Sequence, residues 1–285
     1  MKNTIEIKNL TKKYQNFSLK NINLNIPSGT IVGLIGENGA GKTTLIKSLL
    51  NIISIDSGII KIFDKDYKQY EKEIKEDIGV VLDNAFFPET LTPKDINYIL
   101  KDIYKSWDKD LFYKYLEQFN LDDHKQIKEL STGMRKKLEI ATSLSHHPKL
   151  LILDEPTSGL DPVVRNEVIE ILQDFIQDEE HTVLLSTHIT TDLEHIADYI
   201  VFIDNGEIIL NKTRDDIFDN YAILKCDEKL FKQIDKSDII KYKKNKYNYE
   251  VLVSNKKEIS KKYKEAVLDK ITLEDLMVLM IKGEK

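Results

Sequence analysis

The residues with the clearest chemical potential form a glycine-rich segment near the N-terminus. Positions 36–43 read G-E-N-G-A-G-K-T, which fits the spacing G-x-x-x-x-G-K-[ST]. The glycines allow a tight loop whose backbone N–H groups converge on an anion. We expect Lys42 to reach the β- and γ-phosphates of a nucleoside triphosphate and Thr43 to offer its hydroxyl to Mg²⁺. The other residues predicted to bind the nucleotide are Gly36, Asn38, Gly39, Gly41 and Thr44.

The sequence around this loop supports a phosphate site. A strand-like run over 30–35 precedes it, and a helical run over 44–51 follows. A helix that begins behind the loop adds the positive end of its dipole to the site. The alternative is an ordinary glycine turn, which this strand-loop-helix context disfavours.

A second segment ends in two carboxylates. Positions 150–156 read L-L-I-L-D-E-P, and so short an unbroken apolar run is typical of a strand buried on both faces of a parallel sheet. Its carboxyl end is expected beside the phosphate loop. There Asp154 is suited to hold Mg²⁺, and Glu155 is suited to polarise an attacking water. The alternative is an exposed acidic turn after a core strand.

Three further segments narrow the class of NTPase. Positions 130–134 read L-S-T-G-M and lead into a helical run, 158–161 read S-G-L-D, and 184–188 read L-L-S-T-H. Taken singly, they are a polar turn, a glycine turn and a strand that ends in a histidine. Together with the phosphate loop and the acidic strand end, they form an ordered set of five motifs.

In this order and spacing, residues 1–215 resemble the ATP-binding subunit of an ATP-binding cassette (ABC) transporter. Positions 130–134 resemble the family signature LSGGQ, 158–161 resemble its D-loop, and His188 resembles its switch histidine. Tyr14 lies where the family places an aromatic ring that stacks on adenine. The resemblance implies ATP and Mg²⁺ as cofactors and ATP hydrolysis as the activity.

The resemblance also implies roles for individual residues. The family forms a head-to-tail dimer with an identical or homologous second ATPase subunit, so Ser131 and Gly133 are expected to act across the interface. Glu155, His188 and Lys42 are the expected catalytic residues. Two positions depart from the family. Thr132 replaces a glycine of the signature, and Asp83 replaces a glutamine that reaches Mg²⁺. Asp83 is therefore either a metal or coupling residue or one without such a role.

Composition limits the remaining possibilities. The chain has 285 residues, of which 41% are hydrophobic and 32% charged, which suits a globular protein of one or two domains. The net charge of -6 argues against nucleic acid as the main partner. The single cysteine, Cys226, fits a reducing cytosol and is expected to be an inert, small apolar residue, with a redox role as the alternative. Because no apolar stretch reaches the ~18 residues of a membrane span, we expect a separate transmembrane permease subunit. The chain itself is then peripheral, at the cytoplasmic face of a bacterial membrane.

The predicted fold class is α/β. It comprises a P-loop NTPase core with a mixed sheet, an N-terminal antiparallel β region, a helical subdomain at about 88–140 and a small α+β C-terminal extension over 216–285. Asn205-Gly206 is expected to form a tight hairpin turn. Trp107 is expected to pack in the helical subdomain, with partner contact as the alternative. The lysine-rich run 241–246 is expected at the surface, with lipid or partner contact as the alternative.

Details of the chain are similar to bacterial exporters of the ABC-2 type. They are Trp107-Asp108, the signature with its basic continuation over 130–138, and positions 186–188. The resemblance implies export of antimicrobial or cytolytic peptides, or of drugs such as peptide antibiotics. The alternatives are an importer ATPase, a binding-only cassette, or an ABC ATPase that moves no solute, as in translation or DNA repair. Against the last, the chain has one cassette, and its phosphate-loop-to-signature gap has neither cysteine nor sustained heptads.

Overall fold

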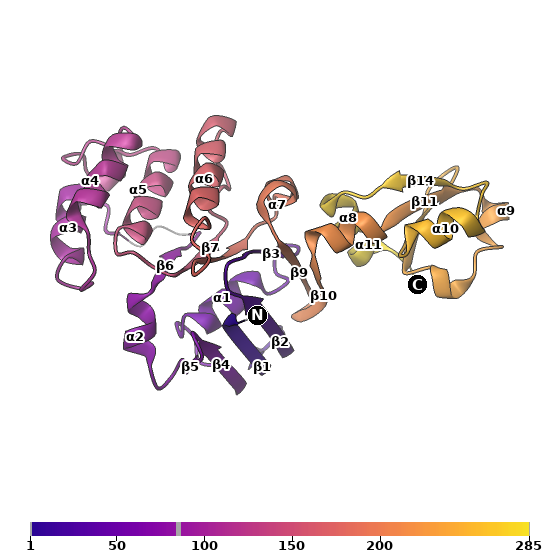
Figure 1. Cartoon of the computed structure of the whole chain (residues 1–285), viewed down its shortest axis with the longest axis horizontal. Coiled ribbons are helices and arrows are strands. Elements are labelled where there is room, and N and C mark those ends of the chain that lie inside the picture. The colour runs from indigo at the N-terminus through magenta and orange to yellow at the C-terminus, as the bar shows by residue number, and fades with distance from the viewer. Residues whose placement is uncertain (1, 84–86, 285) are drawn as a thin grey trace.

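The computed structural model describes residues 2–83 and 87–284 and contains three sheets (Figure 1). The central sheet has six strands in the order β10-β9-β3-β8-β7-β6. Five of them run parallel, and only β10 is antiparallel to its neighbour β9. The strands of this sheet are β3 (Ile31–Ile35), β6 (Ile78–Val81), β7 (Leu150–Asp154), β8 (Thr182–Ser186), β9 (Tyr199–Asp204) and β10 (Glu207–Thr213).

Alternation along the central strands directs side chains to two separate cores. In β3, Ile31 and Ile35 join the core beneath the helices, while Val32 and Leu34 join the core that faces the N-terminal sheet. Both faces are therefore apolar, which explains the unbroken apolar runs in the sequence. The covering helices are α3 (Pro93–Leu100), α4 (Lys109–Gln118), η1 (Ile127–Glu129), α5 (Thr132–Leu144), α6 (Pro162–Phe175) and α7 (Thr190–Ile196).

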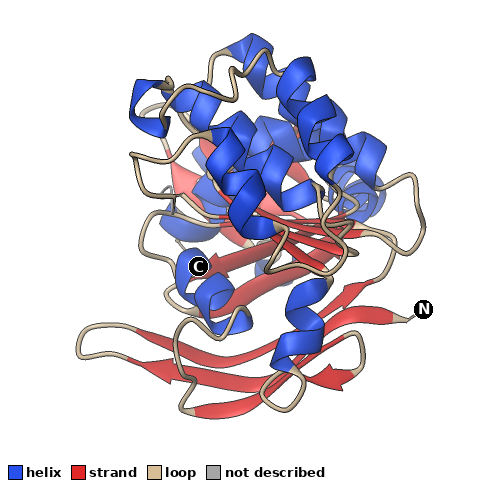
Figure 2. Cartoon of the chain, turned by 90° about the vertical axis from the view of Figure 1, so that its left-hand side faces the viewer, coloured by secondary structure: helices blue, strands red, loops and turns tan. Residues whose placement is uncertain are grey.

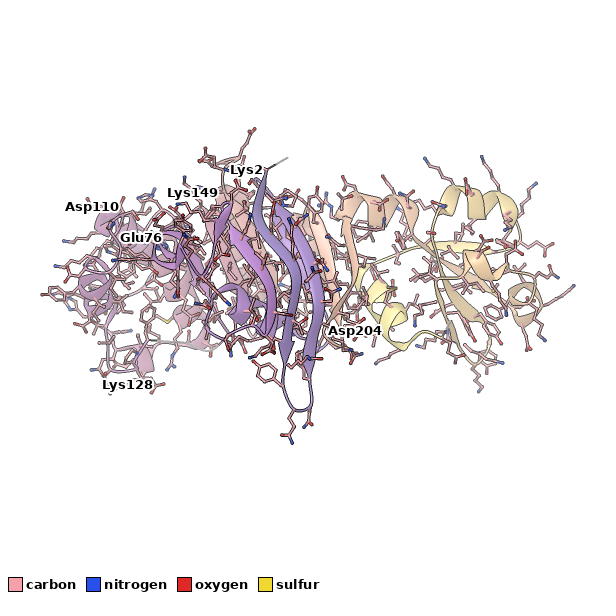
Figure 3. The ribbon with its side chains drawn as sticks, turned by 90° about the horizontal axis from the view of Figure 1, so that it is seen from below. Lys2, Glu76, Asp110, Lys128, Lys149 and Asp204 are labelled. Carbon is pink, nitrogen blue, oxygen red and sulfur yellow. The ribbon has the colours of Figure 1, made fainter. Side chains whose placement is uncertain are left out.

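The opposite face of the central sheet is covered by the N-terminal antiparallel sheet, with α1 between the two (Figure 2). Its strand order is β2-β1-β4-β5. The elements of this layer are β1 (Asn3–Lys13), β2 (Ser18–Pro27), α1 (Lys42–Leu49), β4 (Ser57–Ile62), β5 (Lys65–Asp66) and α2 (Glu71–Glu76). The tip of the β1–β2 hairpin projects from the body on the same side as Asp204, away from Lys2 and Lys149 (Figure 3).

The helical part between β6 and β7 has its own packing. Thr92 and Asp95 form a capping box at the start of α3, and Asp108 caps α4. The indole Nε1 of Trp107 donates to Oδ1 of Asn97 over 3.0 Å, and the ring packs 5.3 Å from that of Phe112. Trp107 therefore packs inside this part of the chain, as the sequence favours.

The C-terminal part is a four-stranded antiparallel sheet in the order β12-β13-β11-β14, with short helices. It comprises α8 (Arg214–Asn220), β11 (Ala222–Cys226), α9 (Glu228–Phe231), η2 (Lys236–Asp238), β12 (Lys241–Lys244), β13 (Tyr249–Val253), α10 (Lys256–Lys262), β14 (Val267–Lys270) and α11 (Leu273–Lys282). It has a core of its own, but α11 packs on α7, and Leu273 N–H donates to Glu194 Oε1 over 2.7 Å. The lysine-rich run lies on the edge strand β12 and the turn after it.

The predicted fold class is confirmed, including the mixed sheet and the small α+β extension. The hairpin turn at Asn205-Gly206 is also present, with φ angles of 47° and 76°. The boundary at residue 215 stays a prediction, because residues on both sides of it share the core that contains Leu193 and Ile217. Among residues 2–83 and 87–284, no helix combines the length and apolar character needed to cross a membrane.

Candidate active site

The predicted phosphate loop follows β3 and ends where α1 begins. Gly41 is the N-cap of α1 with a φ of 116°, and a Cβ there would lie 2.8 Å from Cζ of Phe17. Both its backbone conformation and the space around it therefore favour glycine. The β9–β10 turn supports the loop from the other side, since Gly206 N–H donates to Ala40 C=O over 2.9 Å.

A cavity of about 540 Å³ opens at this loop. This volume lies in the range of roughly 300–1,000 Å³ that small-molecule sites occupy. Seven of the predicted site residues line it, namely Asn38, Gly39, Gly41, Lys42, Thr43, Thr44 and Glu155. Asn16, Phe17, Glu37 and Asn205 complete the lining. The backbone of the loop and the start of α1 thus face a space large enough for a nucleotide.

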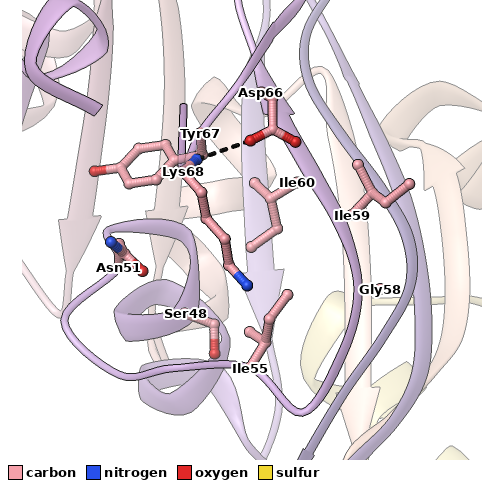
Figure 4. A pocket seen from close by; sticks show the side chains of 9 residues that line it. All are labelled: Ser48, Asn51, Ile55, Gly58, Ile59, Ile60, Asp66, Tyr67 and Lys68. Carbon is pink, nitrogen blue, oxygen red and sulfur yellow. Dashed lines mark hydrogen bonds between the residues drawn. The ribbon is translucent and has the colours of Figure 1, made fainter. Parts of the chain in front are cut away.

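A second cavity, between the end of α1 and strands β4 and β5, is much smaller (Figure 4). Its volume is about 50 Å³, and the N–H of Lys68 donates to Oδ1 of Asp66 over 3.0 Å at its rim. It is too small for a nucleotide. Its lining residues are Ser48, Asn51, Ile55, Gly58, Ile59, Ile60, Asp66, Tyr67 and Lys68.

Lys42 is buried at the floor of the larger cavity. Its ammonium donates to the Gly36 carbonyl over 2.7 Å and lies 3.8 Å from Oε1 of Glu155. Burial lowers the pKa of Lys42, and the carboxylates of Glu155 and Asp154 partly offset this effect. The ammonium is thus held by the carbonyls of Gly36 and Glu37 and by one carboxylate, at a place where a triphosphate would bring compensating negative charge.

Asp154 joins the phosphate loop to the neighbouring strand. The carboxylate is buried at the end of β7, where Oδ2 accepts from the Thr43 hydroxyl over 2.8 Å and Oδ1 accepts from the Ser186 hydroxyl over 2.5 Å. A carboxylate and a hydroxyl oxygen therefore meet below the cavity. These are the hard oxygen ligands that Mg²⁺ prefers, so the residues present fit this cation.

Glu155 and His188 are brought together by adjacent parallel strands. Nδ1 of His188 lies 2.7 Å from Oε2 of Glu155, and because a carboxylate only accepts, the proton is on Nδ1. Glu155 has a φ of 51°, and its N–H donates to the Ser186 carbonyl over 2.9 Å. A non-glycine residue in this region is strained and is held there by its surroundings.

Other predicted residues lie outside the cavity lining. Tyr14 is half exposed in the β1–β2 turn, where its N–H donates to the Phe17 carbonyl over 2.7 Å. Phe17, which the sequence reasoning missed, is the aromatic residue that lines the cavity. The sequence signal that could have identified Phe17 is its position in the same short β1–β2 turn as Tyr14.

The signature segment begins α5 on the exposed side. Ser131 is its N-cap, with Oγ accepting from the Met134 N–H over 3.3 Å. Gly133 is not tightly packed, since a Cβ at this position would lie 3.7 Å from Cδ2 of Leu160, an ordinary contact distance. None of the residues lining the cavity comes from this segment. Ser131 and Gly133 therefore do not line the cavity of their own chain, and a contact of these residues with a nucleotide would have to form outside that lining.

Asp83 is exposed and is the second residue after β6, the strand that pairs with β7. The preceding carbonyl, of Leu82, accepts from the buried ammonium of Lys136 in α5 over 3.2 Å. Lys136 also lies 3.2 Å from Glu139. Burial raises the pKa of Glu139, and the charge of Asp83 adds to this rise while Lys136 opposes it. The Asp83 strand end and the signature helix are thus directly connected.

Comparison with known proteins places these motifs in a family. The family model described as "ABC transporter" matches residues 19–158. The chain is 38% identical over 214 residues to the lantibiotic transport ATP-binding protein SrtF of Streptococcus pyogenes, covering 74% of this chain and 91% of the relative. It is 35% identical over 212 residues to the bacitracin transport ATP-binding protein BcrA of Bacillus licheniformis, covering 73% and 69%.

The fold has solved counterparts. A structure described as the ATP binding subunit of an ABC transporter aligns with a TM-score of 0.68 and 26% identity, covering 75% of this chain and 91% of that chain. The relatives and this structure match about three quarters of the chain.

Proposed function

This chain belongs to the family of ATP-binding subunits of ABC transporters, and from that membership we propose that it powers the export of antimicrobial peptides. The chain is an ATPase whose hydrolysis drives transport through a separate membrane subunit. The peptide substrate is proposed because SrtF is a lantibiotic transport protein and BcrA a bacitracin transport protein. Lantibiotics and bacitracin are both peptide antibiotics, so a peptide antibiotic is the substrate class they share.

The single observation that carries the proposed chemistry is the contact of Glu155 with both Lys42 and His188. We assign to Glu155 the role of orienting the attacking water and accepting its proton. His188 would hold this carboxylate through Nδ1–H and present its other ring nitrogen towards the γ-phosphate. Lys42 would leave Glu155 for the β- and γ-phosphates. Catalysis is then mostly positioning and compensation of phosphate charge.

Mg²⁺ is proposed to bind below the cavity, with Thr43 and Asp154 as its protein ligands and Asp83 as a further candidate. When bound, Mg²⁺ would neutralise charge on the β- and γ-phosphates. Thr43 lies 2.8 Å from Asp154, so the two side chains can serve one cation together. Ser186 would keep Asp154 oriented through the second carboxylate oxygen.

A second ATPase subunit is proposed to complete the site. Ser131 and Gly133 are accessible at the start of α5 and lie outside the cavity lining of their own chain. A head-to-tail partner would bring its own signature segment over the phosphate loop, so that the hydroxyl, the backbone N–H groups and the helix end face the γ-phosphate. Thr132, which replaces a glycine of the family signature, is exposed. Its side chain can therefore extend into solvent in the isolated subunit.

The membrane subunit is proposed to dock beside α2 and the end of α3. A cavity of about 440 Å³ there is lined by Ile103, Tyr104 and four charged residues of α2. Tyr98, Ile99 and Ile103 expose apolar surface nearby. Such a mixed apolar and charged hollow suits an amphipathic cytoplasmic helix of a permease, and this docking would make the chain peripheral to the membrane.

The test is ATP hydrolysis by the chain alone and after co-purification with the membrane protein encoded beside it. We expect the partner to increase hydrolysis, and expression of the pair to raise the resistance of a sensitive strain to a lantibiotic or to bacitracin. Ile103→Glu should weaken co-purification while leaving the hydrolysis of the isolated chain unchanged. Hydrolysis without any co-purifying membrane protein, and no gain in resistance, would favour an ABC ATPase that moves no solute.

A further inference from the structure

The carboxylate of Asp192, in the first turn of α7, is buried and lies close to the active site without lining the cavity. Oδ2 accepts from the Thr157 hydroxyl over 2.8 Å. Oδ1 accepts from the guanidinium of Arg165, which also donates to the Thr191 hydroxyl over 2.7 Å. A buried charge is stable only when it is paired and hydrogen-bonded, and both carboxylate oxygens meet this condition.

The three residues of this network lie on three segments of the proposed site, namely the turn of Glu155, the segment of His188 and the helix after the D-loop. Thr157 follows Glu155 by two positions, in the turn after β7. Asp192 follows His188 by four positions, on the helix after β8. Arg165 lies in the first turn of α6, the helix capped by Asp161 of the D-loop. One carboxylate therefore connects the Glu155 turn, the His188 segment and the D-loop helix.

This connection can hold Glu155 in the geometry that its contact with His188 requires. Glu155 has a left-handed backbone, and its carboxylate must meet His188 from a neighbouring strand. Strained residues keep such geometry only when their surroundings fix it. The Thr157 hydroxyl supplies a side-chain constraint on the Glu155 turn from the side of α7. A loss of this constraint would let Glu155 and His188 shift relative to each other.

We propose that Asp192, Thr157 and Arg165 are positioning residues for ATP hydrolysis, which set the relative placement of Glu155, His188 and the D-loop helix. This inference rests on the proposed roles of Glu155 and His188. None of the side-chain hydrogen bonds of this network goes to residues 36–43 of the phosphate loop, so the network should govern turnover and leave nucleotide binding intact. Misplacement of a catalytic group by about 1 Å can cost on the order of a hundredfold in rate.

The decisive comparison is between Thr157→Val and Thr182→Val. Each removes a buried hydroxyl with one side-chain hydrogen bond of 2.8 Å, but Thr182 bonds Thr4 at the opposite end of the sheet. We expect Thr157→Val to lower kcat at least about tenfold with KM for ATP unchanged. Thr182→Val should leave both constants as in the wild type. Equal effects of the two variants on kcat, or a change confined to KM, would overturn the inference.

Arg165→Lys gives a second test in a partly exposed position, should Thr157→Val fail to fold. Lysine keeps the charge but cannot donate to Asp192 and Thr191 in the fork geometry of arginine. We expect a loss of kcat that is not additive with that of Thr157→Val, because both variants act on the same carboxylate. Wild-type kcat in Arg165→Lys would overturn the inference.

Glu155→Gln separates this inference from the function on which it rests. If Glu155→Gln abolishes turnover while Thr157→Val and Arg165→Lys retain it, the positioning network is wrong and the proposed catalytic role stands. If Glu155→Gln retains turnover, the proposed role of Glu155 itself is wrong.

Discussion

Nδ1 of His188 lies 2.7 Å from Oε2 of Glu155, although 33 positions separate the two residues in the chain. The contact arises because β7 and β8 are adjacent and parallel, so that the residues following each strand meet at the same edge of the sheet. The other oxygen of Glu155 faces Lys42. Glu155 is thus already aimed at both groups that are expected to surround the γ-phosphate.

Glu155→Gln tests this arrangement, since it removes the charge and proton affinity of the side chain while preserving its shape. We expect ATP binding to be retained and turnover to fall by a factor of at least about 100, the range typical of a lost general base. Steady-state hydrolysis and equilibrium binding of a fluorescent ATP analogue measure the two quantities. Glu180→Gln, at an exposed site, is the matched control. Unchanged turnover in Glu155→Gln would contradict the assignment.

The Mg²⁺ dependence of ATP hydrolysis should show which of two carboxylates, Asp154 or Asp83, contributes more to metal binding. Asp154 is buried against Thr43 at the end of β7, whereas Asp83 is exposed after the end of the neighbouring strand β6. We expect Asp154→Asn to raise the Mg²⁺ concentration for half-maximal hydrolysis by about tenfold or more, and Asp83→Asn to raise it less. A Mg²⁺ titration of hydrolysis at fixed ATP measures this. The reverse ranking would make Asp83 the principal metal ligand.

The sequence predicted the fold class and the elements that carry the motifs because those signals are local. Apolar runs bounded by glycine, proline and acidic residues placed β3, β7 and β8, and the motif spacing placed the phosphate loop before α1. The parallel arrangement of these strands then follows from the family's fold, which the solved structures share. The residues expected after each strand therefore lie at one edge.

The remaining site features depend on packing between distant segments. Phe17 and Asn205 line the cavity because two hairpins meet beside the phosphate loop: Lys20 N–H donates to Gly206 C=O, and Gly206 N–H donates to Ala40 C=O in the loop. Arg165 meets Asp192 across 27 positions, through the contact of α6 with α7. No periodicity or motif specifies such contacts, since they are set by how helices pack on the finished sheet.

The stability of the protein should fall in mild acid because of His146. This imidazole is buried, stacks on Tyr104 with ring centroids 4.1 Å apart, and lies 3.0 Å from the Ile78 carbonyl through Nε2. Burial lowers its pKa, and the carbonyls of Ile78 and Thr142 and the charge of Glu76 only partly offset this. As the pH falls below about 6.5, His146 therefore takes up a proton more readily in the unfolded chain than in the folded chain.

Since the folded-state pKa is the lower one, the stabilisation is complete above the unfolded-state pKa and is lost as the pH falls towards the folded-state value. One such group contributes a slope of at most about 1.4 kcal/mol per pH unit. His146→Phe keeps the ring stack and should reduce the slope of the unfolding free energy between about pH 6.5 and 5. Urea denaturation measures it, with His124→Asn at an exposed site as control. An unchanged slope in His146→Phe would show that other groups cause the acid sensitivity.

Cys226 should resist alkylation in the folded protein. The thiol is buried at the end of β11, and burial, helped by the charge of Asp227, raises the pKa of Cys226 to about 11. Because the thiolate is the reactive form, labelling by iodoacetamide at about pH 8 should be at least about a hundredfold slower than for a free thiol. The rate should reach the free-thiol value in denaturant. A double variant that combines Cys226→Ser with Ser237→Cys, at an exposed position of η2, should react fast in the folded state.

As Cys226 is the only cysteine of the chain, the labelling rate reports opening of the C-terminal sheet alone. Fast labelling of the folded wild type would therefore mean that β11 detaches from β13 and β14 while the rest of the protein stays folded.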